Sequence, residues 1–414
     1  MKMNSQEELF QAYRPYCAAL ATKPSHEILE SLKRLVERDS NPDLGLIEEY
    51  IMFPVQLYLK TPIMPENYTL AVLDFVKLFY AKTSLTSEFV IRDLVNSCLA
   101  ICMNKKELLS EDFKLSYASL VQTMIKSADT NVHLQIYSSQ EWKLPLSHLV
   151  SQFLEWAETD ASRNVVLSSM SVIEELITIG SSIKEAAAFL ERFTPMLPGV
   201  TTKIIKTVKR SFPSQSHKIK SKGVLLWQKA VTSVFNDTNV TNLTMEHSAN
   251  TFLNDSQWVG KAQDHLHQHL QILASMVLHP HIMVRQSLQK MCENICAQSW
   301  KMLENARPVQ LEMLAQLSVD QECPALRDQS CKTLQKLLKK VRDENEPEEP
   351  GKDEFPAWLV QLAHGKIFEV SQTISHPDYT ENRFHDDTSL ERYLATLHGF
   401  LVLLKFIEES RYVS

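Results

Sequence analysis

The stretch "PHIMVRQSLQKMCENI", residues 280–295, decides the fold when it is set beside "PALRDQSCKTLQKLL", residues 324–338. In each stretch a proline and a hydrophobic–arginine pair, ending at Arg285 or Arg327, come just before an apolar helical pattern. The two arginines lie 42 residues apart, which is within the ~40–47-residue period of HEAT and armadillo repeats. A third stretch, "DASRNVVLSSMSVIEELI" from residue 160, looks like another helix of this kind. The repetition predicts an all-α fold, a HEAT/armadillo-like α-solenoid of stacked antiparallel helix pairs.

Apolar residues recur at three- and four-residue steps along most of the chain, as in Leu29, Leu32 and Val36. A helix with one apolar stripe can bury that stripe only against neighbouring helices. In HEAT repeats the second helix of each pair lines the concave face, and an arginine near its start commonly bonds to the next repeat. We therefore expect Arg285 and Arg327 to be structural. Candidate helices run near residues 5–22, 26–38, 44–60, 67–82, 86–103, 110–127, 141–157, 162–179, 183–193, 198–211, 217–235, 256–278, 281–304, 308–318, 324–342, 355–374 and 388–409.

Composition excludes several other classes of protein. The chain has 414 residues, of which 44% are hydrophobic and only eight are glycine. So few glycines leave little room for phosphate-binding loops or the tight turns of α/β enzymes. The formal charge of −7 is too small to predict a nucleic-acid or membrane partner from bulk electrostatics. The partners expected are therefore other proteins, and the sequence points to no small-molecule substrate.

The sequence contains no Walker, GxGxxG, GxSxG, HExxH or paired CxxC motif, so we expect no enzyme activity, no catalytic residues and no cofactor. Two cysteine pairs at i, i+4 spacing, Cys98 with Cys102 and Cys292 with Cys296, are more typical of a helical core than of a metal site. His265 and His269 share a helix face and could bind zinc, which would make a metal-dependent enzyme the rival hypothesis. We expect instead that these histidines are solvated surface residues and that no metal binds.

A basic stretch is the strongest local indication of a partner. It runs from residue 203 to residue 229 without an acidic residue. On a helix Lys203, Lys206 and Arg210 would form one stripe, which could dock an acidic protein surface or a phosphate backbone. The alternative is a solvated face. The residues predicted to bind a partner are Lys203, Lys206, Lys209, Arg210, Lys218, Lys220 and Lys222.

Composition changes along the chain predict five segments. Residues 1–235 and 257–342 are expected to be HEAT-like repeats, separated by a flexible loop rich in Asn and Thr at residues 236–256. An acidic linker at 343–354 precedes C-terminal helices at 355–414, which would be the end of a truncated array.

The first residues, "MKMNSQEELFQAYRPYC", lack the apolar core of a signal peptide. No stretch approaches the ~20 apolar residues that a membrane-spanning helix requires. We expect a soluble protein in the cytoplasm, with the nucleus as a second location.

Three tracts carry a resemblance to a known family: "EEYIMFPVQLYLKTP" at residues 48–62, "LSEDFKLSYASLVQTM" at 109–124 and "VLHPHIMVRQSLQKM" at 277–291. They resemble the N-terminal region of the Tel-two-interacting protein one family, the large HEAT-repeat subunit of the Triple-T co-chaperone complex. The first tract is the most specific of the three, and the similarity extends from about Leu9 to Leu404. Family members are typically much longer, so this chain would be a fragment, a short isoform or a divergent paralogue.

The resemblance implies a non-catalytic scaffold that binds the other Triple-T subunits. It also implies that the chain, with the heat-shock chaperone machinery, supports the maturation and stability of PIKK-family kinases of the TOR and ATM types. The alternative is an unrelated HEAT adaptor or transport-type module that binds acidic or phosphate-bearing partners through the basic stretch. Reversing the charge of those lysines would distinguish the two, because phosphate contacts depend steeply on salt.

Overall fold

The computed structural model describes residues 2–60, 65–104, 109–183, 185–210, 216–239, 251–344, 357–375, 394 and 396–405. All of the regular secondary structure in these residues is helical. Leu85 and Ala128 form an isolated β-bridge. Contacts within the chain group into two compact units. The first holds Met1–Thr207 with Ser248–Thr251, and the second holds Val208–His247 with Phe252–Ser414. The predicted all-α repeat fold is confirmed.

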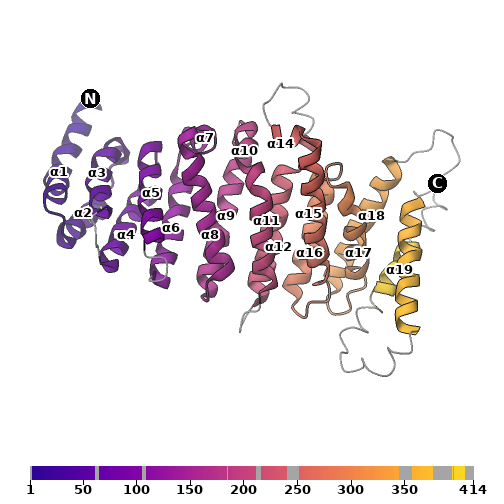
Figure 1. Cartoon of the computed structure of the whole chain (residues 1–414). Helices are drawn as coiled ribbons and strands as arrows, with labels where there is room; N and C mark the ends of the chain where they lie inside the picture. Colours follow the sequence, from indigo (N-terminus) through magenta and orange to yellow (C-terminus); the bar gives the residue numbers. More distant parts are fainter. Residues whose placement is uncertain are drawn as a thin grey trace. The chain divides into compact units, whose positions relative to one another are not determined.

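The helices of the first unit stand side by side in chain order (Figure 1). Their bounds are α1 Lys2–Thr22, α2 His26–Arg38, the 3-10 helix η1 Pro42–Ile47, α3 Glu48–Leu59, α4 Glu66–Lys82, α5 Glu88–Asn104, α6 Glu111–Ser127, α7 Thr130–Ser138, η2 Gln140–Trp142, α8 Lys143–Thr159, α9 Arg163–Ser182, α10 Ala186–Phe193 and η3 Thr194–Met196. Helix α11, Leu197–Lys209, begins in the first unit and ends in the second.

Contacts between these helices define two layers in the first unit. The first layer consists of α1, α3, α5 and α8, each of which packs on the next. The second layer consists of α2, α4, α6 and α9, which also pack in that order. Contacts between the layers, such as α1 with α2 and α8 with α9, bury the apolar stripes. This is the stacking that the periodicity predicts, and Arg163–Ser182, the third stretch of the repeated pattern, lies in the second layer as expected.

Serine side chains begin three of the four second-layer helices. Ser25, Ser110 and Ser162 each accept a hydrogen bond from the backbone N–H three residues later, which satisfies a donor that the first helical turn leaves unpaired. The second-layer helices begin at His26, Glu66, Glu111 and Arg163, so successive repeats span 40, 45 and 52 residues. The first two values are typical of HEAT repeats.

The longer third repeat contains an additional helix, α7, which the sequence analysis did not predict. Its nine residues are too few for periodicity to identify a helix. It packs on α9 and α10. Gly180 of α9 makes room there, because a Cβ at this position would lie 2.3 Å from a ring carbon of Phe189 and 2.8 Å from one of Tyr137. The Leu85–Ala128 bridge joins the α4–α5 loop to the residue that follows α6.

The second unit repeats the arrangement. Its helices are α12 Ser216–Val234, α14 Thr251–Asn254, α15 Ser256–Ala274, α16 Ile282–Gln298, η4 Glu304–Ala306, α17 Arg307–Leu317, α18 Pro324–Glu344 and α19 Ala357–Ser375, followed by a helical segment at Thr396–Lys405. The first residue of α14, Thr251, is assigned to the first unit. Helix α16 packs on α12, α17 and α18, and α15 packs on α17. The two stretches that predicted the fold, α16 and α18, are therefore adjacent second helices.

Helix α9 differs from expectation in its composition. Among the described residues it is the one helix long and apolar enough to cross a membrane by length and composition, although no such stretch was expected. Half of that apolar window is buried, and α9 packs on α6, α7, α8 and α10. Its hydropathy therefore has a structural explanation, since a helix covered on several sides is apolar around much of its circumference.

Parts of the predicted segment division lie outside the described residues. They include residues 240–250 of the predicted loop, 345–354 of the predicted acidic linker, and 355–356, 376–393, 395 and 406–414 of the predicted C-terminal helices. At the edges of these segments, Thr251–Asn254 is helical and α18 continues to Glu344. The predicted segment boundaries stay predictions.

Candidate protein-binding surfaces

Polar side chains at the starts of the second-layer helices bond one repeat to the next. Ser110, at the start of α6, donates a hydrogen bond to Glu66 at the start of α4. Ser162, at the start of α9, donates to Glu111 at the start of α6, with 2.6 Å between Oγ and Oε1. The same serine therefore caps its own helix and bonds the previous repeat. A serine placed directly before a periodic helix is the sequence signal for the cap, whereas the identity of its partner depends on the stacking.

The predicted structural role of Arg285 is confirmed. Its side chain is almost fully buried, and it donates to Asp320 at 2.7 Å and to Glu322 at 2.6 Å. It also donates to the backbone carbonyl of His279 at 2.8 Å. Arg285 thus joins the start of α16 to the loop between α17 and α18. In the first unit Lys114 of α6 makes the corresponding contact. It pairs at 2.6 Å with Asp160, in the loop between α8 and α9.

Arg327 occupies the equivalent place on α18 but has a different environment. Its side chain is 48% exposed, and the ion pair described for it is with its sequence neighbour Asp328, at 3.6 Å. Residues 376–393, which follow α19, lie outside the described part of the chain. The repeat-to-repeat role predicted for Arg327 therefore stays a prediction.

The first two residues of the predicted basic site face an acidic residue. The ammonium groups of Lys203 and Lys206 each lie 3.4 Å from a carboxylate oxygen of Glu158, on α8. Although residues 203–229 contain no acid, the fold supplies one from 45 residues earlier in the chain. The stripe is thus less cationic than its sequence suggests.

The other five residues of the predicted site belong to the second unit. Lys209 and Lys218 are exposed, whereas Arg210, Lys220 and Lys222 are partly buried. The structure thus divides the basic stretch between two units, and Glu158 brings together Lys203 and Lys206. Whether these seven residues bind a partner stays a prediction.

Three histidines and a lysine gather where α12 and α16 begin. The rings of His217 and His281 stack with 3.6 Å between their centroids and 4° between their planes. His279 accepts a hydrogen bond from the backbone N–H of His281. Burial lowers the pKa of His279, and the charges of Lys220 and of the other two histidines lower it further. The stacked rings thus join the beginnings of α12 and α16.

The expectation that His265 and His269 are solvated is wrong for His269. Its side chain is only 5% exposed, and its Nδ1 accepts a hydrogen bond from the indole N–H of Trp227 at 3.3 Å. Burial, followed by the charge of His265, lowers the pKa of His269 to about 4. The two rings do share a face, with centroids 4.3 Å apart. His269 is a hydrogen-bonded core residue, which a position on an apolar stripe beside Leu270 and Leu273 could have indicated.

Both cysteine pairs lie in helical cores, as predicted. Cys98, Cys102, Cys292 and Cys296 are all buried, and burial is the main cause that raises the pKa of each thiol, in Cys102 and Cys296 to about 12. Within the part of the chain that the structure describes, no group of three or more His, Cys, Asp and Glu side chains is arranged to hold a metal ion.

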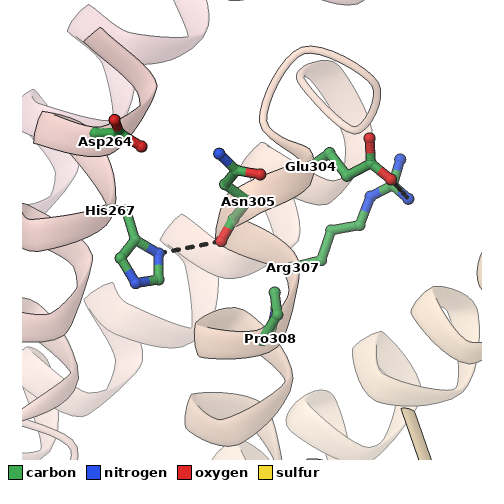
Figure 2. Close-up of a pocket in the computed structure, with 6 residues that line it drawn as sticks. All are labelled: Asp264, His267, Glu304, Asn305, Arg307 and Pro308. Atoms are coloured by element: carbon green, nitrogen blue, oxygen red, sulfur yellow. Dashed lines mark hydrogen bonds and ion pairs between the residues drawn. The ribbon is translucent and has the colours of Figure 1, made fainter. Parts of the chain in front are cut away.

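A surface cleft of about 500 Å³ lies between α15 and the start of α17, lined by Asp264, His267, Glu304, Asn305, Arg307 and Pro308 (Figure 2). His267 bonds across it, with 3.0 Å between Nδ1 and the carbonyl oxygen of Asn305. Because a carbonyl can only accept, Nδ1 carries the proton and Nε2 accepts from Gln271.

The cation of the cleft, Arg307, is also engaged within the protein. Its guanidinium stacks over the ring of Trp300 at 4.1 Å and donates to the backbone carbonyl of the same residue. It further pairs with Glu304 at 3.4 Å and with Glu344 at 3.3 Å. The polar groups of the cleft thus serve to join α15, α17 and α18, and we assign it no ligand.

The tract at residues 48–62, the most specific part of the family resemblance, begins with a buried carboxylate. Glu48 accepts hydrogen bonds from the hydroxyl of Tyr80 at 2.8 Å, from the backbone N–H and hydroxyl of Thr86 at 3.0 and 2.7 Å, and from the backbone N–H of Ser87 at 3.2 Å. Burial and the charge of Glu48 hold the pKa of Tyr80 well above its usual range. Glu48 thus joins the start of α3 to α4 and to the loop before α5.

The same tract exposes two large apolar side chains, Phe53 and Leu57, one turn apart on α3. In the described residues of the first unit, exposed large apolar side chains occur on first-layer helices and on η1. They are Tyr16, Leu46, Phe53, Leu57, Phe89, Met103 and Leu144. The sequence analysis did not single out these residues as a surface, because an apolar residue beside a buried stripe looks like part of the stripe.

Residues 10–321 match the model of a family described as "TTI1 N-terminal TPR domain". A human protein named TELO2-interacting protein 1 homolog is 25% identical over 360 residues, which cover 80% of this chain and 32% of that protein. The mouse protein of the same name is 24% identical over 363 residues, which cover 81% of this chain and 33% of that protein. The chain therefore spans about a third of the length of these relatives.

The family match covers well over half of the chain, and it includes in full all three tracts that carry the resemblance. The matched residues begin in α1 and continue to the loop before α18. The chain belongs to the TTI1 family.

Proposed function

We propose that this chain is a non-catalytic scaffold that binds a TELO2-type protein and the other helical-repeat subunits of a Triple-T complex. The observation that carries the proposal is the family match over residues 10–321, together with relatives named for their interaction with TELO2. Stacked helix pairs suit this role, because each repeat adds contact area to an extended surface without forming a pocket.

Through this complex, and with the heat-shock chaperone machinery, the chain would support the maturation and stability of PIKK-family kinases of the TOR and ATM types. We place this activity in the cytoplasm, with the nucleus as a second location. The chain spans about a third of its relatives, so its contribution would be the contacts that the N-terminal repeats make.

The alternative was an unrelated HEAT adaptor for acidic or phosphate-bearing partners. Because the chain belongs to the TTI1 family, it is not an unrelated adaptor. The ion pairs of Lys203 and Lys206 with Glu158 also weaken it, because part of the basic stripe is already neutralised. What remains of the alternative hypothesis is an anionic partner that binds Lys218 and Lys220.

Affinity purification tests the proposal. The 414-residue chain would be tagged in its native cells and purified gently, and the co-purifying proteins would be identified by mass spectrometry against an untagged control. Recovery of a TELO2-type protein and of PIKK-family kinases is expected. A chain that is folded by circular dichroism but recovers none of these proteins would refute the proposal for this part of the family's sequence.

A further inference from the structure

The first unit distributes its exposed apolar side chains unevenly between its two layers. In the described residues all seven lie on η1 or on the first-layer helices α1, α3, α5 and α8, and none lies on α2, α4, α6 or α9. The second layer, which by analogy with other HEAT proteins would be the binding face, instead has its polar side chains bonded from repeat to repeat. The layer with uncovered apolar surface is the first.

Helices α3 and α5, which carry Phe53, Leu57 and Phe89, pack against each other. The amide of Gln56 donates to the carbonyl of Val90 at 3.2 Å, and Lys60 pairs with Asp93 at 2.7 Å, so α3 and α5 lie alongside each other. Phe53 and Leu57 therefore belong to the helix that packs beside α5, and Phe89 directly precedes the residue that Gln56 bonds.

A second set of contacts continues the arrangement to α8. The indole N–H of Trp142 donates to Glu88 at 2.8 Å, and Arg92 pairs with both Glu88 and Glu141. The start of α8, with Leu144, therefore lies beside the start of α5. We call Phe53, Leu57, Phe89 and Leu144 the apolar edge. The side chains of Phe53, Phe89 and Leu144 are 60%, 58% and 67% exposed, although large exposed apolar groups in a row are unfavourable in water.

The charges beside the apolar edge indicate which sign of charge a partner protein would carry there. The four carboxylates nearby are Glu49, Glu88, Asp93 and Glu141, and the three cations are Lys60, Arg92 and Lys143. Arg92 is shared between Glu88 and Glu141, and the latter is 68% exposed. Carboxylates thus outnumber cations, and a partner with basic residues beside its apolar contacts would complement them.

We infer that the apolar edge docks an amphipathic α-helix of a partner protein, one that presents bulky apolar side chains at three- and four-residue spacing with lysine or arginine beside them. The row crosses three neighbouring helices of one layer, which suits the i, i+3, i+4, i+7 pattern of a helix laid across them. This inference deepens the proposed scaffold function and rests on it, since it names the surface and the chemistry of the partner but not the partner's identity.

Site-specific cross-linking in native cells tests the inference with the full chain. The photoreactive amino acid p-benzoylphenylalanine would be incorporated at Phe53 or at Phe89, and, as a control, at Phe368 on α19. Phe368 is a phenylalanine of similar exposure, 64%, in the second unit. After irradiation the cross-linked peptides would be mapped by mass spectrometry.

The expected result is a cross-link from positions 53 and 89, absent at 368, to one helical segment with the stated apolar and basic pattern. A synthetic peptide of that segment should bind the purified chain, and Phe53→Ser with Phe89→Ser should weaken it at least tenfold, while Phe368→Ser leaves it unchanged. Circular dichroism would check that each variant is folded.

Several results would overturn the inference. They are cross-links to a second copy of this chain, cross-links to an acidic or non-helical segment, yields no higher than at position 368, or a peptide affinity that the double substitution does not change. These outcomes are separate from the proposed function, which fails if no TELO2-type protein co-purifies, whatever cross-links to the apolar edge.

Discussion

At the scale of single residues, Glu48 is the most constrained polar group that the structure describes in the first unit. Four donors from three residues surround a carboxylate that is 2% exposed. A buried carboxylate is stable only when its lone pairs are satisfied in this way. Its place at the start of α3 adds a favourable interaction with the positive end of the helix dipole.

Replacing Glu48 should therefore destabilise the first unit. In Glu48→Gln the amide oxygen can still accept from Thr86 and Ser87, but the four hydrogen bonds lose their charged acceptor, and the amide nitrogen faces the hydroxyl of Tyr80, which now has to accept instead of donate. We expect the free energy of unfolding to fall by about 2 to 3 kcal/mol, measured by urea denaturation. The matched control is Glu49→Gln at the exposed neighbouring position, which should change stability by less than about 0.5 kcal/mol. Equal effects would contradict this account of Glu48.

His269 makes stability depend on pH. Its pKa is 6.5 in the unfolded chain and about 4 in the folded protein, so between these values the unfolded state binds a proton that the folded state does not. Stability is therefore full above pH 6.5 and is lost as the pH falls toward 4, by on the order of 2 kcal/mol.

His269→Gln should flatten this dependence, because the amide oxygen can still accept from the indole N–H of Trp227 and does not titrate. Urea denaturation at pH 7, 6 and 5 would compare it with the wild type. His267→Gln, on the face that borders the cleft, is the control and should keep the wild-type slope. If the His269→Gln profile parallels that of the wild type, another group causes the acid sensitivity.

At the scale of elements, the contact of α9 with α7 and α10 depends on a glycine. Gly180 is buried in α9 beneath the rings of Phe189 and Tyr137. These rings also contact each other, with centroids 5.6 Å apart, and the hydroxyl of Tyr137 donates to the carbonyl of Leu176 at 2.6 Å. With both aromatic rings held in place, little room remains for a methyl group.

We expect Gly180→Ala to lower the free energy of unfolding by about 1 to 3 kcal/mol, because overpacking the contact outweighs the better helix propensity of alanine. Gly199→Ala is the control within α11, since no atom lies within 4 Å of its new Cβ. That substitution should be neutral or stabilising by up to about 1 kcal/mol. Thermal unfolding of both variants makes the comparison, and a stabilised Gly180→Ala would show that the rings move aside.

At the scale of the whole molecule, the question is which charges are available to a partner. Lys203→Glu with Lys206→Glu would place three carboxylates together around Glu158 and would confuse binding with stability. Lys218, an exposed residue of α12, avoids this difficulty. For the proposed scaffold, Lys218→Glu should change co-purification of a TELO2-type protein by less than about twofold, with a shallow salt dependence.

Loss of that partner, together with a steep dependence on salt, would instead favour an anionic partner at the start of α12. The measurement is the recovered amount of the TELO2-type protein at two salt concentrations, normalised to the tagged chain. Circular dichroism of the variant would exclude unfolding as the cause.

The helical class, the position of most helices, the adjacency of α16 and α18 and the structural use of Arg285 could all be predicted from the sequence. Each follows from local patterns, namely apolar spacing of three and four residues, proline before a helix, and a spacing of 42 residues between the two repeated stretches. Helix α7 was missed because a nine-residue helix is too short to show periodicity.

Only the tertiary structure decided the rest, because it depends on residues distant in the chain. Glu158 reaches the basic stripe from another helix, Trp227 satisfies a buried His269, and Thr86 and Ser87 enclose Glu48. The apolar edge likewise exists only because α3, α5 and α8 stand side by side. Apolar periodicity shows that a helix has a face to bury, whereas the packing of its neighbours decides which apolar residues remain exposed.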